Sequence, residues 1–180
     1  MRTAALLAGF VLLAACTSPS HPLPGGPKFE SGEVRFAAPT GWEVRQPTTG
    51  SPDLDQVVAY LANQPLREDC PEVRTAISCG TALTDGLRAG GMLVAWAGRP
   101  CVAQACALPT ATLIAIGNRQ GVRTPTDVGC EGTGFTERAA YYVTVTPQRV
   151  DILLVCARDP SDATRSAFLG FLDAIRWRIP

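Results

Sequence analysis

Histidine is almost absent from this sequence: His21 is the only one among 180 residues. A Ser-His-Asp triad or a Cys-His pair needs a histidine beside the nucleophile, so neither is available to a folded domain that begins near residue 33. The same shortage disfavours a zinc site, as does the lack of any two cysteines with C-x2-C spacing. We therefore expect no catalytic residue, no cofactor, no metal and no enzymatic activity.

Neither sign of charge is in excess. The chain has 16 Lys and Arg against 16 Asp and Glu, a formal net charge of zero, and the basic residues are scattered along it. Lys28 is the only lysine. A nucleic-acid-binding protein needs a basic patch or stripe to neutralise phosphates, so nucleic acid is not expected as a partner.

Long hydrophobic runs that could span a membrane are also lacking. Arg2 precedes an apolar stretch from Ala4 to Leu13, which is shorter than the ~20 residues of a spanning helix. The stretch ends in Leu13-Ala14-Ala15-Cys16, which resembles the cleavage site of a bacterial lipoprotein signal peptide.

The lipoprotein pattern implies that residues 1–15 are removed after Ala15 and that the Cys16 thiol receives a diacylglyceryl group. Two or three acyl chains hold a soluble domain stably on a bilayer, whereas one chain is marginal. We therefore expect a lipid-anchored protein on the extracytoplasmic face of the cell membrane. The alternative is an ordinary secretory signal peptide with a chance cysteine, which also exports the chain.

Cysteine, in contrast, is abundant in this sequence. Of the seven, six remain after Cys16, and an even number outside the cytosol implies disulfides. Six cysteines allow 15 connectivities, among which sequence alone cannot choose. Nearness in the chain and the strand layout favour the pairs Cys70–Cys79, Cys101–Cys106 and Cys130–Cys156.

A tether follows the lipidated cysteine. Residues 17–28 contain four prolines, a Gly25-Gly26 pair and almost no apolar side chains, a composition typical of an extended linker. We expect this tether over residues 16–32 and one globular domain over residues 33–180.

The first strands are predicted from alternation. Glu33 to Ala38 places apolar residues at period two and ends at Pro39-Thr40-Gly41, and Trp42 to Arg45 resumes the alternation. We expect a hairpin in which Trp42 and Val44 face the same way as Phe36.

Two helices are predicted in the first half. Ser51-Pro52-Asp53 has an N-cap, a proline at the first helical position and an acidic first turn. Leu54, Val57, Val58 and Leu61 follow at helical spacing, up to about Pro65, although the β-branched Val57-Val58 leaves a strand open. A second helix is expected over Ala82–Arg88.

The second half predicts a sheet and a closing helix. Met92–Ala97 is a continuous apolar run typical of a strand buried on both faces, and Thr112–Gly117 is a further strand. Glu137–Thr146 and Val150–Ala157 flank a turn at Pro147 and form a hairpin. Asp159 and Pro160 open the last helix, which reaches about Ile175 and has the apolar stripe Phe168, Phe171, Leu172 and Ile175.

Three candidate sites have a functional and a structural interpretation. Asp53 and Asp55 suit a weak cation site or a carboxylate pair, but helix capping explains them better. Gly129–Gly134 looks like a phosphate loop, but a strand follows it, which favours a turn beside a disulfide. Arg176-Trp177-Arg178 suits an anionic surface, whereas simple alternation puts Trp177 in the core.

The segment Phe36-Ala37-Ala38-Pro39-Thr40-Gly41-Trp42, the late hairpin and the closing helix with Phe168, Leu172 and Trp177 resemble the PsbP-like family. The resemblance implies an α+β fold, an α/β/α sandwich of mainly antiparallel sheet covered by helices. The family includes photosystem subunits, a Ran-binding nuclear import factor and envelope lipoproteins of high-GC Gram-positive bacteria. It implies a non-enzymatic scaffold that binds protein partners, and in its lipoprotein branch a role in envelope assembly; it transfers no site residue.

Two functions follow as expectations. The first is a membrane-anchored factor that binds an envelope protein, which predicts a filled core and an exposed apolar patch of several hundred Å². The second is a carrier of a hydrophobic or lipid ligand, which predicts an enclosed apolar cavity of ~300 Å³ or more.

Overall fold

The computed structural model describes residues 21, 24–30, 33–46, 56–66, 86–101, 106, 108–130 and 134–178. Ordered along the chain, the elements are β1 (Lys28–Glu30), β2 (Val34–Ala37), β3 (Glu43–Arg45), β4 (Gln56–Ala62), β5 (Met92–Pro100), β6 (Thr112–Ile116), β7 (Arg119–Pro125), β8 (Glu137–Thr146), β9 (Arg149–Ala157), α2 (Asp162–Ala174) and β10 (Arg176–Trp177).

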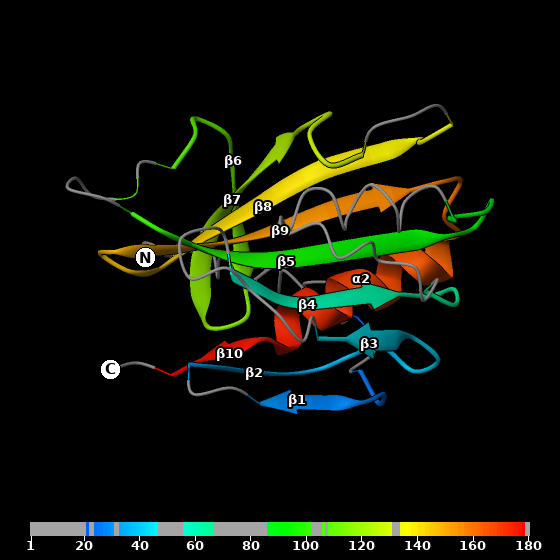
Figure 1. Cartoon of the computed structure of the whole chain (residues 1–180), viewed down its shortest axis with the longest axis horizontal. Helices are drawn as coiled ribbons and strands as arrows, with labels where there is room; N and C mark the ends of the chain where they lie inside the picture. Colours follow the sequence, from blue (N-terminus) through cyan, green and yellow to red (C-terminus); the bar gives the residue numbers. More distant parts are fainter. Residues whose placement is uncertain are drawn as a thin grey trace, which may run out of the picture.

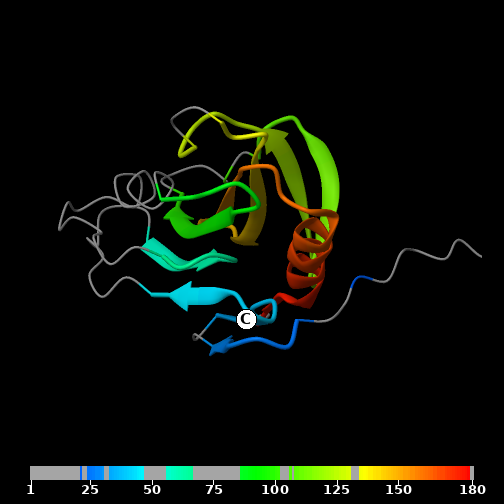
Figure 2. The same ribbon diagram turned by 90° about the vertical axis from the view of Figure 1, so that its right-hand side faces the viewer.

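Two antiparallel sheets carry the fold (Figure 1). The larger has seven strands in the order β3-β4-β5-β9-β8-β7-β6, and the smaller has three in the order β1-β2-β10. Viewed from the side, the large sheet is curved, with α2 beside its β6-to-β8 half and the small sheet below (Figure 2).

The main core lies between the large sheet, α2 and the small sheet. Side chains alternate along a strand, and on this face the even positions of β5 and the odd positions of β8 and β9 are buried. Phe36 of β2 packs at 5.2 Å from the Trp96 ring and at 5.5 Å from the Phe171 ring of α2. These aromatic contacts join all three layers.

The opposite face of the large sheet is covered differently. Leu66, Leu87 and Phe135 pack there against Leu93 of β5 and the buried Cys130 and Cys156, so irregular segments cover this part of it. In the part of the chain that the structure describes, α2 is the only helix. The described residues are therefore dominated by antiparallel sheet, with a helix on one face.

Several predicted elements are confirmed. Met92–Ala97 lies in β5, whose residues on both faces are buried, and Thr112–Gly117 contains β6. The late hairpin is β8 and β9, paired over nearly their full length. The predicted stripe of the last helix, Phe168, Phe171, Leu172 and Ile175, is buried in the core.

The helix predicted from Leu54 to about Pro65 is wrong where the structure describes it, because residues 56–62 form β4. This strand lies between β3 and β5, and Ala59, Tyr60 and Leu61 are all buried. A strand covered on both faces has no polar side to display period two, so its apolar residues also match a helical spacing. The β-branched Val57-Val58 was the correct signal.

The predicted hairpin of β2 with β3 is also wrong. Trp42 donates its backbone N–H to Pro39 O at 3.1 Å, and Gly41 between them has a φ of 80°, the geometry of a turn that requires glycine. The turn leads the chain out of the small sheet into the large one, where β3 pairs with β4. Phe36 and Trp42 still meet in one core.

Three boundaries differ from the predictions. β1 lies within the segment assigned to the tether and pairs with β2. The cap of the last helix is Ser161, whose side chain accepts a hydrogen bond from Thr164 N, rather than Asp159. The helix predicted over Ala82–Arg88 is not present at residues 86–88, and its remainder lies outside the described residues.

Candidate functional site

Two of the three expected cysteine pairs are disulfides in the structure. Cys101 is bonded to Cys106 and Cys130 to Cys156, each with a Cα–Cα distance of 5.4 Å. Cys130 and Cys156 are buried, whereas Cys101 and Cys106 are half-buried against the outer face of β8 and β9. The third pair, Cys70–Cys79, and the lipid-attachment residue Cys16 lie outside the described residues.

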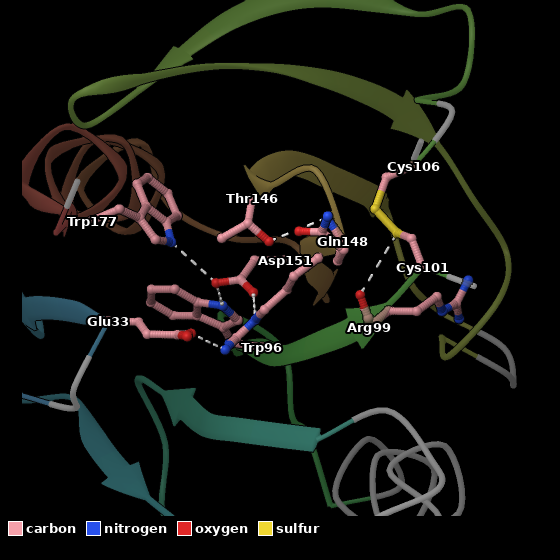
Figure 3. Close-up of polar contacts among 10 residues, drawn as sticks. Glu33, Trp96, Arg99, Cys101, Cys106, Thr146, Gln148, Asp151 and Trp177 are labelled. Carbon is pink, nitrogen blue, oxygen red and sulfur yellow. Dashed lines mark hydrogen bonds and ion pairs between the residues drawn. A yellow bond between two sulfur atoms is a disulfide. The ribbon is translucent and has the colours of Figure 1, made fainter. Parts of the chain in front are cut away.

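Asp151 of β9 is the only fully buried polar side chain among the described residues, with an exposure of 0%. Its Oδ2 accepts hydrogen bonds from the indole N–H groups of Trp96 and Trp177, both at 3.1 Å, and its Oδ1 accepts one from Arg149 Nε at 2.8 Å (Figure 3). Both carboxylate oxygens are thus hydrogen-bonded, as a buried charge requires.

The Arg149 guanidinium links this carboxylate to the small-sheet side of the molecule. Arg149 Nη1 also donates to Glu33 (Figure 3), the residue that precedes β2. A Cβ at Gly98 would lie 2.8 Å from Arg149 Nε, so the absence of a side chain there lets the guanidinium lie against β5. Since Asp151 is sealed and fully bonded, we interpret the cluster as a structural link and not as a catalytic site.

A pocket of about 240 Å³ lies on the face of the large sheet that carries the main core, between the β6-to-β8 half of that sheet and α2. Its lining combines apolar side chains from five elements with a charged rim, and the rim leaves it open to solvent. The apolar residues are Met92, Ile114, Ala139, Val155, Phe168 and Leu169, and the polar ones are Arg123, Glu137, Arg138, Tyr141 and Arg165.

The rim charges are mostly paired. Arg165 contacts Glu137 and also Asp162 at 2.8 Å, and Arg138 contacts Asp127 at 2.9 Å. Hydrogen bonds to these two carboxylates raise the pKa of the Arg165 guanidinium. The Arg165–Glu137 pair thereby holds α2 to the start of β8.

Tyr141 and Arg123 form a second pair in the pocket, directly opposite each other on β8 and β7. Arg123 Nε donates to the Tyr141 hydroxyl at 3.3 Å, and its guanidinium lies 5.9 Å from the ring centroid. Burial raises the pKa of Tyr141, and the hydrogen bond from Arg123 partly opposes that rise. The phenol is therefore neutral and able to donate a proton into a hydrogen bond.

Strand β6 ends the large sheet beyond β7. Leu113 is 66% exposed, the most exposed large apolar side chain in the described part of the chain, and Val128 at 59% is the other. Ala115 is exposed on the same side of the strand as Leu113, while Ile114 turns inward and lines the pocket. The strand therefore presents an apolar side to solvent.

The structure describes all or part of two of the three candidate sites that the sequence suggested. Trp177 is buried in the core, and Arg176 and Arg178 are exposed, which confirms simple alternation. Gly129 and Cys130 lie in a turn beside the Cys130–Cys156 disulfide, as expected. Asp53 and Asp55 lie outside the described residues, and within those residues no group of three potential metal ligands occurs.

Sequence reasoning missed Asp151, Tyr141 and Arg123. The signal for Asp151 was present, because it is a lone acid inside the apolar run Val150–Ala157. Tyr141 and Arg123 carry no such signal, because Arg123 lies on β7, a strand that was not predicted. Their pairing depends on the register between β7 and β8.

Comparison with protein-family models, with curated proteins and with solved structures found no match to this chain. Among the described residues, no helix is long and apolar enough to cross a membrane.

Proposed function

We propose that this protein is a non-enzymatic, extracytoplasmic lipoprotein, anchored to the cell membrane through acylated Cys16, that binds an envelope protein partner along strand β6. The partner supplies an extended segment that adds to the sheet by backbone hydrogen bonds. The proposal keeps the PsbP-like resemblance and its α/β/α sandwich: the antiparallel sheet and α2 on one face agree with that fold, and the described residues include no helix on the other face.

The observation that carries the proposal is the chemistry of the β6 edge. Natural sheets protect edge strands from other chains with charged side chains, proline or a covering element. The three other sheet ends have such charges: Lys28 and Glu30 on β1, Arg176 on β10, and Glu43 and Arg45 on β3. Strand β6, Thr-Leu-Ile-Ala-Ile, has no charged residue and no proline. Although α2 contacts this strand, Thr112, Leu113 and Ala115 are exposed, so β6 is the edge best suited to strand addition.

Membrane attachment is proposed from the sequence Leu13-Ala14-Ala15-Cys16, which resembles a lipoprotein cleavage site. Replacing Cys16 by Ala is expected to remove radiolabelled palmitate and to move the protein out of the membrane fraction; a variant that stays bound and labelled would contradict the anchor.

The docking proposal is tested by photo-crosslinking in the native envelope. A photoreactive residue at position 113 is expected to crosslink to one discrete envelope protein. The same residue at position 128, an equally apolar exposed site in a turn, is the matched control and is expected not to. Adding Ala115→Lys should abolish the crosslink from position 113. Equal labelling from both positions, or none from position 113, would refute docking at β6.

The alternative function is a carrier of a hydrophobic or lipid ligand. Enclosing a whole ligand of that kind needs roughly 300–1,000 Å³, whereas the pocket beside α2 has about 240 Å³ and opens at a charged rim. Its size favours partner binding as the main function.

A further inference from the structure

We infer that the pocket between α2 and the sheet binds the end of a single-chain amphiphile with a carboxylate head group, which Tyr141 and Arg123 hold at the rim while the chain lies on the apolar floor. This inference does not rest on docking at β6, since Leu113 and Ala115 face away from the pocket.

The floor of the pocket fits a hydrocarbon chain. Phe168 and Leu169 of α2 face Ala139 and Val155, which are directly paired on β8 and β9. Met92 at the start of β5 and Ile114 on β6 extend this surface, so the floor has no polar side chain to satisfy. Removing apolar surface from water contributes about 25 cal/mol per Å², which favours a chain over an ordered water cluster.

Tyr141 supplies a hydrogen-bond donor at the rim. The side chain is 6% exposed, and its oxygen accepts the bond from Arg123 Nε. The hydroxyl proton has no acceptor among the described residues, although a buried hydroxyl normally finds one. A carboxylate oxygen in the pocket would accept this proton.

Arg123 supplies the charge. The other rim arginines are neutralised by carboxylates: Arg165 by Glu137 and Asp162, and Arg138 by Asp127. Arg123 has no acidic partner among the described residues, and its hydrogen bond to Tyr141 uses only Nε. Its Nη groups are thus available for the planar contact that arginine makes with a carboxylate. This charge complementarity selects an anionic head over an alcohol or an amine.

The volume of the pocket limits how large a hydrocarbon ligand can bind. At about 240 Å³ the pocket lies below the usual range for sites that enclose a drug-sized ligand. One acyl chain end fits, and a two-chain phospholipid does not. We therefore choose decanoate as the probe and decanol as its uncharged match.

The experiment is isothermal titration calorimetry of the mature chain, residues 16–180, with Cys16 replaced by Ser to keep it soluble. Decanoate, below its micelle concentration, is expected to bind at least about tenfold more tightly than decanol. Arg123→Gln and Tyr141→Phe are each expected to weaken decanoate binding about tenfold, as for loss of a charge-assisted or buried hydrogen bond, and to leave decanol unchanged. Arg35→Gln, an exposed arginine on β2, is the control and should change neither.

Absence of decanoate binding by the folded protein would overturn the inference, as would equal affinity for decanol. Loss of affinity in Arg35→Gln equal to that in Arg123→Gln would also overturn it, because it would indicate a nonspecific charge effect. Leu169→Trp should fill the pocket and abolish binding while retaining the circular dichroism spectrum of the wild type. None of these outcomes bears on the crosslink from position 113, so the two proposals fail separately.

Discussion

At the scale of single residues, the fold depends on one buried charge. Asp151 joins β9 to Trp96 of β5 and to Trp177 of β10, and through Arg149 to Glu33. The residues that it joins come from both sheets, so one carboxylate fixes how the small sheet sits on the large one. Such a group is costly to bury but more costly to remove when its partners remain.

Asp151→Ala is expected to destabilise the protein by about 3–5 kcal/mol, because it leaves two buried indole N–H groups and the Arg149 guanidinium without their acceptor. Urea unfolding followed by tryptophan fluorescence measures this loss. Asp173→Asn, an exposed acid at the end of α2, is the control and should change stability by less than about 0.5 kcal/mol. Equal midpoints for the two variants would show that Asp151 is not a structural link.

A second residue-scale prediction concerns pH. Burial raises the pKa of Tyr60 to about 12, whereas a tyrosine in the unfolded chain titrates near ~10. Above pH ~10 the unfolded chain loses this proton while the folded protein keeps it. The contribution of Tyr60 to stability is therefore constant below that pH and falls up to pH ~12. The expected slope is at most about 1.4 kcal/mol per pH unit for one group.

Tyr60→Phe should therefore flatten the alkaline loss of stability measured by urea titrations between pH ~9 and ~12. Few other groups titrate in this pH range, because Lys28 is the only lysine. The pKa of Tyr141 is also raised by burial, so Tyr141 accounts for part of the slope that remains in the variant. Identical slopes in the variant and the wild type would contradict the assignment.

At the scale of elements, the β6–β7 hairpin is attached to residues 175–177, which directly follow α2 and include β10. Asn118, in its turn, donates from Nδ2 to Trp177 O at 2.9 Å and accepts from Trp177 N at 3.0 Å. Gly117 beside it has a φ of 57°, and a Cβ there would overlap the Ile175 carbonyl oxygen. The close approach of the two backbones thus requires glycine.

Gly117→Ala is expected to destabilise the protein by clearly more than Gly90→Ala. Both glycines have positive φ, so each substitution costs about 1–2 kcal/mol in backbone strain, but a Cβ at Gly90 meets nothing within 4 Å. The difference in unfolding free energy between the two variants measures the contact of the hairpin with Ile175, the residue that follows α2. Equal losses would show that the hairpin is not held there.

Elements with a regular signal could be predicted from the sequence, and those set by tertiary contacts could not. β5 and the β8–β9 hairpin were predictable because their apolar runs are long and end at clear turns. β4 was not, since a strand buried on both faces also matches a helical spacing. β7 contains Gly121 and Pro125 and has Val122 as its only large apolar residue, so its pattern gives no strand signal. Gly121 is nevertheless required, since a Cβ would meet the Tyr142 carbonyl oxygen at 2.5 Å.

At the scale of the whole molecule, the disulfides differ in what they constrain. The Cys130–Cys156 bond spans 26 positions, and both of its cysteines are buried, whereas Cys101–Cys106 spans five positions, and its two cysteines are half-buried. In the chain-entropy model the longer loop contributes about 3.5 kcal/mol and the shorter about 2.2 kcal/mol. The burial of Cys130 and Cys156 further increases the difference in stability between the two disulfides.

The double variant Cys130→Ala/Cys156→Ala should therefore lose more stability than Cys101→Ala/Cys106→Ala. Thermal unfolding of the two exported variants makes the comparison, with each matched for the number of sulfur atoms removed. A larger loss for the pair at 101 and 106 would mean that the loop they close, and not the β9 core, limits stability.

Strand addition at β6 is the central feature of the proposed function, and amide hydrogen exchange tests it most directly. The measurement compares the backbone amides of Thr112–Ile116 in the lipidated protein within envelope membranes and in the purified protein. Strand addition predicts that β6 amides exchange more slowly in the membranes, while those of the central strand β5 exchange equally in both. Equal exchange of β6 in the two samples would contradict the account.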